Sequence, residues 1–200
     1  AGEGPVDLTW GLIISLVRGI HTEDRLARNG MWGTIVGPAL TGKTLGLLGL
    51  GHIGKLVAQV GIAFGMNVIA WSENLTQQIA RQHGVKYVDK KTLFTDSDVL
   101  SVHLKLSDRT RGIISKKELS LMKPSSYLIN TSRGPIIDEK SLIDALNTMK
   151  ISGAAIDTFD IEPLPINHPL FSTPNTIITP HIGYVTREAY DIYTEGIIEN

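Results

Sequence analysis

Three polar residues in the second half of the chain have side chains suited to anion binding and proton transfer: Arg133, Glu162 and His181. An arginine can hold a carboxylate through two parallel hydrogen bonds. A histidine titrates near neutral pH and can exchange a proton with a carbonyl oxygen. A carboxylate beside a histidine favours the charged ring and fixes its orientation. Together the three side chains would suit reduction of a 2-oxo acid, which needs a held carboxylate and a protonated carbonyl oxygen.

Each of these residues also has an ordinary structural explanation. Arg133 could be a surface cation, Glu162 an exposed turn residue, and His181 a histidine bonded to backbone groups. For each residue alone that explanation is favoured, because polar loop residues are mostly solvated. The functional interpretation is favoured for the set, since the three follow successive predicted strands beside a predicted dinucleotide crevice.

Residues 49–54, Gly-Leu-Gly-His-Ile-Gly, have the spacing of a dinucleotide-binding turn. They directly follow a predicted strand and open a predicted helix, which is the context that the motif requires. Gly49 can form the tight turn, Gly51 lets the backbone approach a pyrophosphate, and Gly54 lets the helix lie close to the strand. Free amides at the start of the helix would face the anion. The alternative is a glycine-rich turn without a ligand, and the flanking elements favour dinucleotide binding.

The choice of cofactor depends on the end of the second predicted strand, where an acidic residue normally binds the adenosine ribose. Ser72 occupies that position, and Glu73 follows it. Ser72 would tolerate the 2′-phosphate of NADP, whereas Glu73 would repel it if its side chain pointed inward. We therefore expect NAD as the cofactor, with NADP as the alternative.

Short apolar runs alternate with amphipathic stretches from residue 44 onward, at a spacing typical of βαβ units. The predicted strands are residues 44–48, 67–71, 86–88, 99–104, 126–130, 153–158 and 176–179. One predicted helix covers residues 53–64 and can end at Gly65 in a left-handed turn. Another covers residues 139–149, with Asp138 as its N-cap. The pattern predicts an α/β fold with a Rossmann-type doubly wound parallel sheet.

A helical arm precedes the first predicted strand. The apolar residues of 8–20 cover nearly the whole circumference of a helix, so this helix must be buried on more than one side, and a partner subunit could cover the second side. A second helix can begin at Thr22, whose hydroxyl would cap it, and end at residues 29–30, Asn-Gly.

Composition indicates a soluble globular chain. Its 200 residues are 42% hydrophobic with a net charge of -1, so no basic surface is expected for nucleic acid or anionic lipid. The apolar stretch at residues 8–20 is shorter than a membrane span. Without cysteine, nothing argues for an oxidising compartment, and we expect a cytoplasmic protein. No metal site is expected, because metal-ligand spacing with carboxylates is lacking at His21, His52, His83 and His168.

Three later motifs carry a resemblance to a known family. They are residues 130–135 (Asn-Thr-Ser-Arg-Gly-Pro), 153–164 (Gly-Ala-Ala-Ile-Asp-Thr-Phe-Asp-Ile-Glu-Pro-Leu) and 179–183 (Thr-Pro-His-Ile-Gly). In order and spacing they resemble the signatures of the D-isomer-specific 2-hydroxyacid dehydrogenases. Residues 102–110 also resemble the adenosine-pocket segment of that family. The resemblance covers essentially the whole chain, and the combination of motifs is specific.

This resemblance implies an NAD(P)-dependent oxidoreductase that transfers a hydride between its cofactor and a small D-2-hydroxy acid or the 2-oxo form. Arg133 would bind the substrate carboxylate, and His181, paired with Glu162, would act as general acid and base. Asp157 would lie near the nicotinamide carboxamide, and His103 would be a structural residue beside the cofactor. The expected cofactor-binding residues are Gly49, Gly51, His52, Ile53, Gly54, Ser72, Thr110, Thr131, Ser132, Asp157 and Gly183.

The chain departs from the family pattern at three positions. Lys105 stands where many relatives have proline, Tyr184 where a small residue is common, and Ser72 where an acid is usual. None of them is one of the three expected catalytic residues. The departures therefore bear on cofactor preference and family branch more than on the reaction type.

By resemblance, we expect this sequence to lack most of the family's substrate domain. We expect residues 1–200 to form one nucleotide-binding domain, with the helical arm and a connecting segment in 1–43 and the core in 44–183. Residues 184–200 would start the helix that returns to the absent substrate domain. By resemblance, residues 8–32 would form a homodimer interface. The fragment alone should turn over poorly, because water exclusion and substrate orientation need the closing domain.

Other functions of the same fold stay open at the level of sequence. Formate dehydrogenases pair the histidine with glutamine, so Glu162 argues against that activity, whereas phosphite dehydrogenases keep the same three residue types. An NAD-sensing interaction module, similar to the C-terminal-binding corepressors, is the alternative from another class. The third alternative is a cofactor-binding fold without catalysis, against which the retained arginine, glutamate and histidine weigh. The sequence does not specify which 2-hydroxy acid is used.

Overall fold

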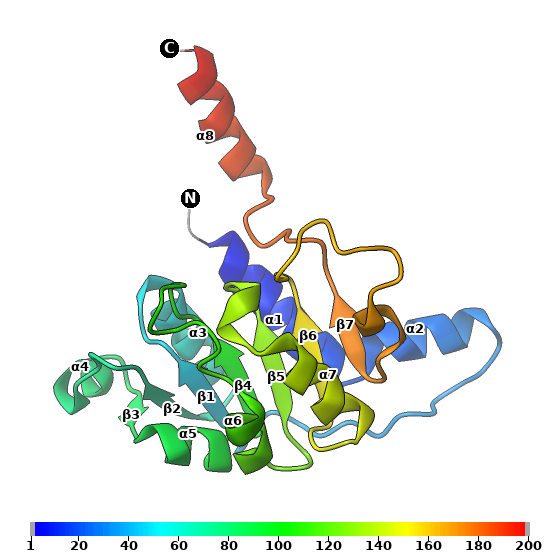
Figure 1. Ribbon diagram of the computed structural model, residues 1–200, viewed down its shortest axis with the longest axis horizontal. Helices are drawn as coiled ribbons and strands as arrows, with labels where there is room; N and C mark the ends of the chain where they lie inside the picture. The colour runs from blue at the N-terminus through cyan, green and yellow to red at the C-terminus, as the bar shows by residue number, and fades with distance from the viewer. Residues whose placement is uncertain (1–2, 199–200) are drawn as a thin grey trace.

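A parallel β-sheet forms the centre of the computed structural model, which describes residues 3–198, with side chains described as far as Ile192 (Figure 1). Every neighbouring pair of strands is parallel, in the order β3-β2-β1-β4-β5-β6-β7. The strands are β1 (Thr44–Leu48), β2 (Asn67–Trp71), β3 (Lys86–Tyr87), β4 (Val99–Val102), β5 (Tyr127–Asn130), β6 (Gly153–Ile156) and β7 (Thr176–Ile178). The predicted α/β fold with a Rossmann-type parallel sheet is confirmed.

Helices cover both faces of this sheet. The helices of the described chain are α1 (Gly4–Val17), α2 (Ile20–Arg28), α3 (His52–Ala63), α4 (Gln77–Gln82), α5 (Lys90–Asp96), α6 (Lys116–Leu121), α7 (Glu139–Asn147) and α8 (Arg187–Ile198), with short 3-10 turns η1 (Gly134–Ile136) and η2 (Pro169–Ser172). Helices α1 and α3 pack on one face, and α5, α6 and α7 pack on the other (Figure 1). The sheet therefore has a buried apolar core on each side.

The predicted strands match the observed ones closely. Residues 44–48 and 67–71 have the predicted bounds, and the other strands are shorter by one or two residues. The strands β4 and β6 end at Val102 and Ile156, where the chain turns into the loops beyond the sheet. At the end of α3 Gly65 has a left-handed backbone, and Asp138 caps α7 by accepting a hydrogen bond from the Ser141 amide, both as predicted.

The helical arm differs from the prediction at its first boundary. Helix α1 begins at Gly4 and ends at Val17, because Gly19 has a left-handed backbone (φ 65°) that interrupts the helix before Ile20. Helix α2 begins at Ile20, so the predicted start and cap at Thr22 are wrong, and the Thr22 amide bonds to the Gly19 carbonyl. The predicted end at residues 29–30 is confirmed, since Asn29 is the C-cap.

The apolar residues of α1 are buried within the chain itself. The helix contacts α3 on one side and strands β5, β6 and β7 on another, and Ile13 is completely buried between them. Burial on more than one side is thus achieved without a second subunit. None of the described helices combines the length and hydropathy needed to cross a membrane.

Three short helices, α4, α5 and α6, were not among the predicted elements. Each begins with a side-chain cap, from Thr76, Asp89 and Ser115 respectively. Helix α6 has a complete capping box, in which Ser115 and Glu118 bond to each other's backbone amides. Helix α8 extends beyond the sheet as a separate arm (Figure 1). Residues 199–200 of the predicted returning helix, and residues 1–2 of the predicted arm, lie outside the described residues.

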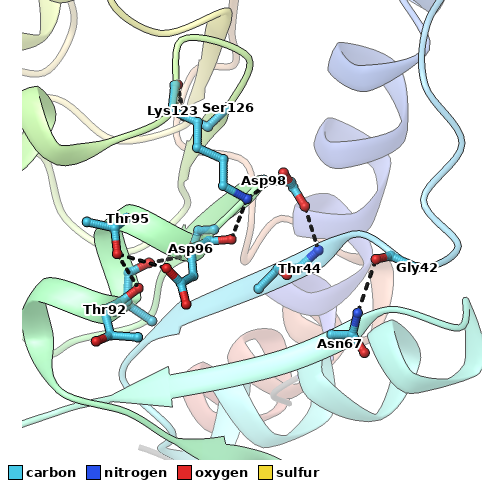
Figure 2. A network of polar contacts seen from close by, with 11 residues as sticks. Gly42, Thr44, Asn67, Thr92, Thr95, Asp96, Asp98, Lys123 and Ser126 are labelled. Atoms are coloured by element: carbon cyan, nitrogen blue, oxygen red, sulfur yellow. Dashed lines mark hydrogen bonds and ion pairs between the residues drawn. The ribbon is translucent and has the colours of Figure 1, made fainter.

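A polar network joins the strands at the edge where they begin (Figure 2). The Asp98 carboxylate accepts hydrogen bonds from the Thr44 amide and the Lys123 ammonium, each at 2.8 Å. Lys123 also donates to the Asp96 carbonyl at 2.7 Å. Burial raises the pKa of Asp98, but the hydrogen bonds from Lys123 and Thr44 outweigh it and hold the pKa below its ordinary value of 3.8. Asp98 therefore links the start of β1 to the segments around β4 and β5.

Replacing Asp98 by asparagine should lower the free energy of unfolding by about 1–2 kcal/mol at pH 7, because Lys123 loses its charged partner. Since the folded carboxyl has the lower pKa, its contribution is present above pH 3.8 and disappears as the pH falls through the folded value. The difference in the free energy of unfolding between wild type and Asp98→Asn, measured by urea unfolding, should thus become smaller below pH 3.8. Asp96→Asn is the matched control, since the exposed Asp96 side chain has, among the described residues, a hydrogen bond from the Thr95 hydroxyl alone. An equal loss of unfolding free energy in Asp98→Asn and Asp96→Asn would contradict the role assigned to Asp98.

Candidate functional site

The glycine turn after β1 is shaped by contacts that exclude side chains. Gly49 has a φ of 106°, and a Cβ there would lie 2.7 Å from the His103 carbonyl oxygen. A Cβ on Gly54 would lie 2.3 Å from the Gly49 carbonyl oxygen. The turn therefore lies directly between the end of β4 and the start of α3. The sheet order reverses between β1 and β4, and crevices at such points bind ligands in open α/β sheets.

The start of α3 has the properties of an anion site. Gly51 is its N-cap and has no side-chain cap, so the first amides of this 12-residue helix have no side-chain partner there. A Cβ on Gly51 would meet no protein atom within 4 Å. Ile53 is half-buried and His52 is exposed beside it. The amides and the open space over Gly51 fit the pyrophosphate of a dinucleotide.

The position that faces an adenosine ribose in Rossmann folds lies next to this turn. Ser72 directly follows β2 and is half-buried, and the preceding Trp71 carbonyl accepts a hydrogen bond from the Gly49 amide. Glu73 is exposed. Thr110, another expected cofactor residue, has its hydroxyl bonded within its own loop, to the Ser107 amide and the Lys105 carbonyl.

His103 lies beneath the glycine turn. Its Nε2 is 2.9 Å from the Ser101 hydroxyl, and burial lowers its pKa to about 4. The ring is therefore uncharged at neutral pH, in accordance with a structural residue at this position.

The turn after β5 places three expected site residues side by side. The Asn130 side chain accepts from the Ser132 amide and donates to the Arg133 carbonyl, both at 3.0 Å. Ser132 donates its hydroxyl to the Leu104 carbonyl, which ties this turn to the end of β4. The Thr131 hydroxyl lies 2.8 Å from the hydroxyl of Thr9 on α1. Thr9 is a buried contact that sequence analysis missed.

Glu162 and His181 form a direct pair. Glu162 Oε2 lies 2.6 Å from His181 Nδ1, and Glu162 Oε1 accepts the Phe159 amide at 2.9 Å. Their side chains are 35% and 30% exposed. Burial raises the pKa of Glu162, but the hydrogen bonds from His181 and Phe159 and the charges of His181 and Arg133 together lower it below its ordinary value. The carboxylate is thus ionised next to the ring, and His181 Nε2 is left to face another group.

Close backbone packing brings the Arg133 loop to this pair. A Cβ on Gly134 would lie 2.2 Å from the Phe159 carbonyl carbon, so the loops after β5 and β6 touch at their backbones. Arg133 is exposed, donates to the Ser132 carbonyl at 2.6 Å, and acts on Glu162 through its charge. The arginine, glutamate and histidine predicted from the sequence are therefore gathered at one edge of the sheet.

Asp157 at the end of β6 is completely buried and bonded within the chain. Its Oδ1 accepts from the Thr179 hydroxyl at 2.6 Å and the Ile182 amide at 2.9 Å, and its Oδ2 accepts from the Gly183 amide at 3.0 Å. His181 lies inside this loop with a left-handed backbone, φ 54°. The ring of Tyr184 packs edge-on against His181, with ring centroids 5.5 Å apart. From its sequence motif Asp157 is expected to contact the cofactor, and its bonds to this loop were not predicted.

A second histidine–glutamate pair lies elsewhere in the fold. His168 Nε2 is 3.0 Å from Glu139 Oε1 at the start of α7. Within the part of the chain that the structure describes, no cluster of three histidine, cysteine, aspartate or glutamate residues could hold a metal ion.

Comparison with known proteins places the chain in a family. Residues 10–183 match the model described as "D-isomer specific 2-hydroxyacid dehydrogenase, NAD binding domain". A glyoxylate reductase of Aeropyrum pernix is 40% identical over a 195-residue alignment, which covers 93% of this chain and 58% of the reductase.

Solved structures agree with the sequence match. A phosphoglycerate oxidoreductase of Vibrio cholerae O395 superposes with a TM-score of 0.93 at 37% identity, covering 100% of this chain and 66% of that one. The NAD-complexed D-isomer specific 2-hydroxyacid dehydrogenase of Lactobacillus delbrueckii ssp. bulgaricus superposes with a TM-score of 0.84 at 29% identity, covering 94% and 62%. The chain thus spans less than two thirds of the length of these proteins. With the glycine turn, the family match and the shared fold in agreement, the chain belongs to the D-isomer specific 2-hydroxyacid dehydrogenases and comprises their NAD-binding domain.

Proposed function

We propose that this chain is the catalytic half of an oxidoreductase that transfers a hydride between NAD(H) and a small D-2-hydroxy acid or its 2-oxo form. The observation that carries the proposal is the 2.6 Å contact between Glu162 and His181. It lies at the same sheet edge as the glycine turn, within reach of the charge of Arg133. Relatives named glyoxylate reductase support a small 2-oxo acid as substrate.

The roles of the three side chains follow from their contacts. Bound NADH would supply the hydride that adds to the carbonyl carbon of the 2-oxo acid. His181 donates a proton to the carbonyl oxygen from Nε2, because Nδ1 is held by Glu162. Arg133 holds the substrate carboxylate in a bidentate contact. In the oxidation direction His181 takes the hydroxyl proton and Glu162 stabilises the charged ring.

The cofactor contacts are proposed in three groups. The glycine turn and the first amides of α3 would hold the pyrophosphate, at Gly49, Gly51, His52, Ile53 and Gly54. Ser72 would contact the adenosine ribose, with Thr110 farther along that side. Thr131, Ser132, Asp157 and Gly183 would hold the nicotinamide end. NAD is favoured over NADP because Glu73 adds negative charge beside the ribose position.

A homodimer through the arm is proposed on its exposed apolar side chains. Since α1 is already covered by α3 and the sheet, a second subunit would contact α2 and the segment after it. Ile20, Met31 and Trp32 are 50%, 48% and 89% exposed and line an open groove with Ala27. Exposed apolar surface of this kind is typical of subunit contacts.

Gly51→Ala should weaken NADH binding by this chain at least tenfold while leaving its unfolding midpoint unchanged. The added methyl meets no protein atom and would occupy the space assigned to the pyrophosphate. Fluorescence titration with NADH measures the effect, and titration with NADPH tests the preference for NAD. Gly11→Ala in α1 is the matched control, because its methyl also meets no protein atom. Unchanged NADH affinity in Gly51→Ala would refute the proposed pyrophosphate position.

His181→Gln should lower kcat for glyoxylate reduction by NADH roughly 10²- to 10⁴-fold in the full-length protein, because it removes the general acid. Arg133→Gln should chiefly raise KM for glyoxylate. His168→Gln is the control, because it alters the other histidine–glutamate pair and should keep wild-type rates. Firm NADH binding with no turnover of any 2-oxo acid by the wild type would instead favour an NAD-sensing module.

Trp32→Arg should convert a dimer into a monomer in sedimentation analysis at micromolar concentration, because it places a charge on the proposed interface. Met149→Arg is the control, since Met149 is 75% exposed on the turn after α7 and does not line the groove that contains Trp32. A monomeric wild type would rule out the proposed interface.

A further inference from the structure

The segment 179–183, called the histidine loop below, is wrapped around one buried carboxylate. Asp157 has no exposed surface, and its carboxylate accepts three hydrogen bonds from this loop. Two of the donors are consecutive backbone amides, those of Ile182 and Gly183. Consecutive amides that follow a left-handed residue form a concave site for an anion. Here the anion is the protein's own side chain.

His181 needs such support because of its backbone. Its φ of 54° lies in the left-handed region, which a residue with a Cβ adopts only when surrounding contacts hold it there. The amides immediately after it are bonded to Asp157, while its own amide bonds to the Thr179 carbonyl at 3.0 Å. The ring reaches Glu162 from this backbone conformation.

The loop also has little room to move toward the strand. A Cβ on Gly183 would lie 3.2 Å from Asp157 Oδ2, so the backbone is in close contact with the carboxylate. Oδ1 takes two donors and Oδ2 takes one. Oδ2 therefore keeps one unused acceptor position, but the carboxylate has no exposed surface, so the expected nicotinamide carboxamide could reach it only after the loop moves.

We infer that Asp157 is the positioning residue for His181: its carboxylate fixes the left-handed backbone of the histidine loop and thereby places the imidazole against Glu162. This inference rests on the proposed role of His181 in proton transfer, and it adds a function for Asp157 separate from any cofactor contact. Asparagine cannot replace the carboxylate, because its amide nitrogen would face an N–H or O–H donor on either side.

The test is solution NMR of the chain without cofactor or substrate. One readout is the hydrogen exchange of the Ile182 and Gly183 amides. The other is the low-field proton resonance of the short His181–Glu162 hydrogen bond. Thr179→Val removes one donor to Asp157 at nearly constant volume, and Thr179→Ser restores it. Asp160→Asn is the control for Asp157→Asn, because it makes the same change three residues away, on a side chain without contact to the loop.

Thr179→Val should speed exchange of both amides roughly tenfold or more, because a hydrogen bond to a charged group is lost from the carboxylate they share. Asp157→Asn should speed it further and remove the low-field resonance. Thr179→Ser and Asp160→Asn should match wild type. If Asp157→Asn does not fold, the Thr179 pair decides the question.

The inference would be overturned if Thr179→Val kept the amide exchange rates and the low-field resonance of wild type. Equal changes of these readouts in Thr179→Val and Thr179→Ser would overturn it as well. An intact loop in Asp157→Asn together with lost NADH binding would overturn it too, and would leave Asp157 a cofactor contact only. Because these measurements need no turnover, failure of the proposed dehydrogenase activity would show separately in the glyoxylate assay.

Discussion

The parallel alignment of the strands determines what the rest of the molecule can do. Because every strand runs in the same direction, every loop that follows a strand emerges at the same edge of the sheet. Strands β5, β6 and β7 are neighbours, so the loops that carry Arg133, Glu162 and His181 are neighbours as well. The glycine turn after β1 opens on the same edge. Residues more than a hundred positions apart are thus brought to one surface by strand pairing alone.

The two edges of the sheet differ in how their polar side chains are bonded. At the edge where strands begin, Asp98, Lys123 and Thr44 satisfy one another and hold the strand starts together (Figure 2). At the opposite edge, the His181 side chain is 30% exposed, and among the described residues its Nε2 has no hydrogen bond. Stability is therefore concentrated away from the groups that have to meet a ligand.

Elements defined by local pattern could be predicted from the sequence. Strands 44–48 and 67–71 are bounded by clear changes in hydropathy, and Gly65 and Asp138 mark helix boundaries by their own chemistry. The boundary between α1 and α2 was misjudged, because an apolar Ile20 continued the pattern across a glycine that breaks the helix. The short helices lacked enough residues for a periodic pattern, although the capping box at Ser115 was present in the sequence.

Site residues were predictable where a motif names them, and not where the contact is long-range. The Glu162–His181 pair lies between two recognisable motifs, and the structure brings the two side chains together. The bonds from Asp157 to residues 179, 182 and 183 depend on how β6 and β7 pair. The contact between Thr9 and Thr131 joins a helix to a loop 122 positions away, and no local sequence pattern predicts it.

That contact between two hydroxyls sets a direction of proton donation. Thr9 has one hydroxyl proton and gives it to the Pro5 carbonyl at 2.6 Å, so the Thr131 proton must point to Thr9. Only lone pairs then remain on Thr131 for any molecule arriving from the open side. An N–H donor is accepted there and a carbonyl oxygen is repelled, so the first helix of the chain fixes the polarity that the Thr131 hydroxyl presents.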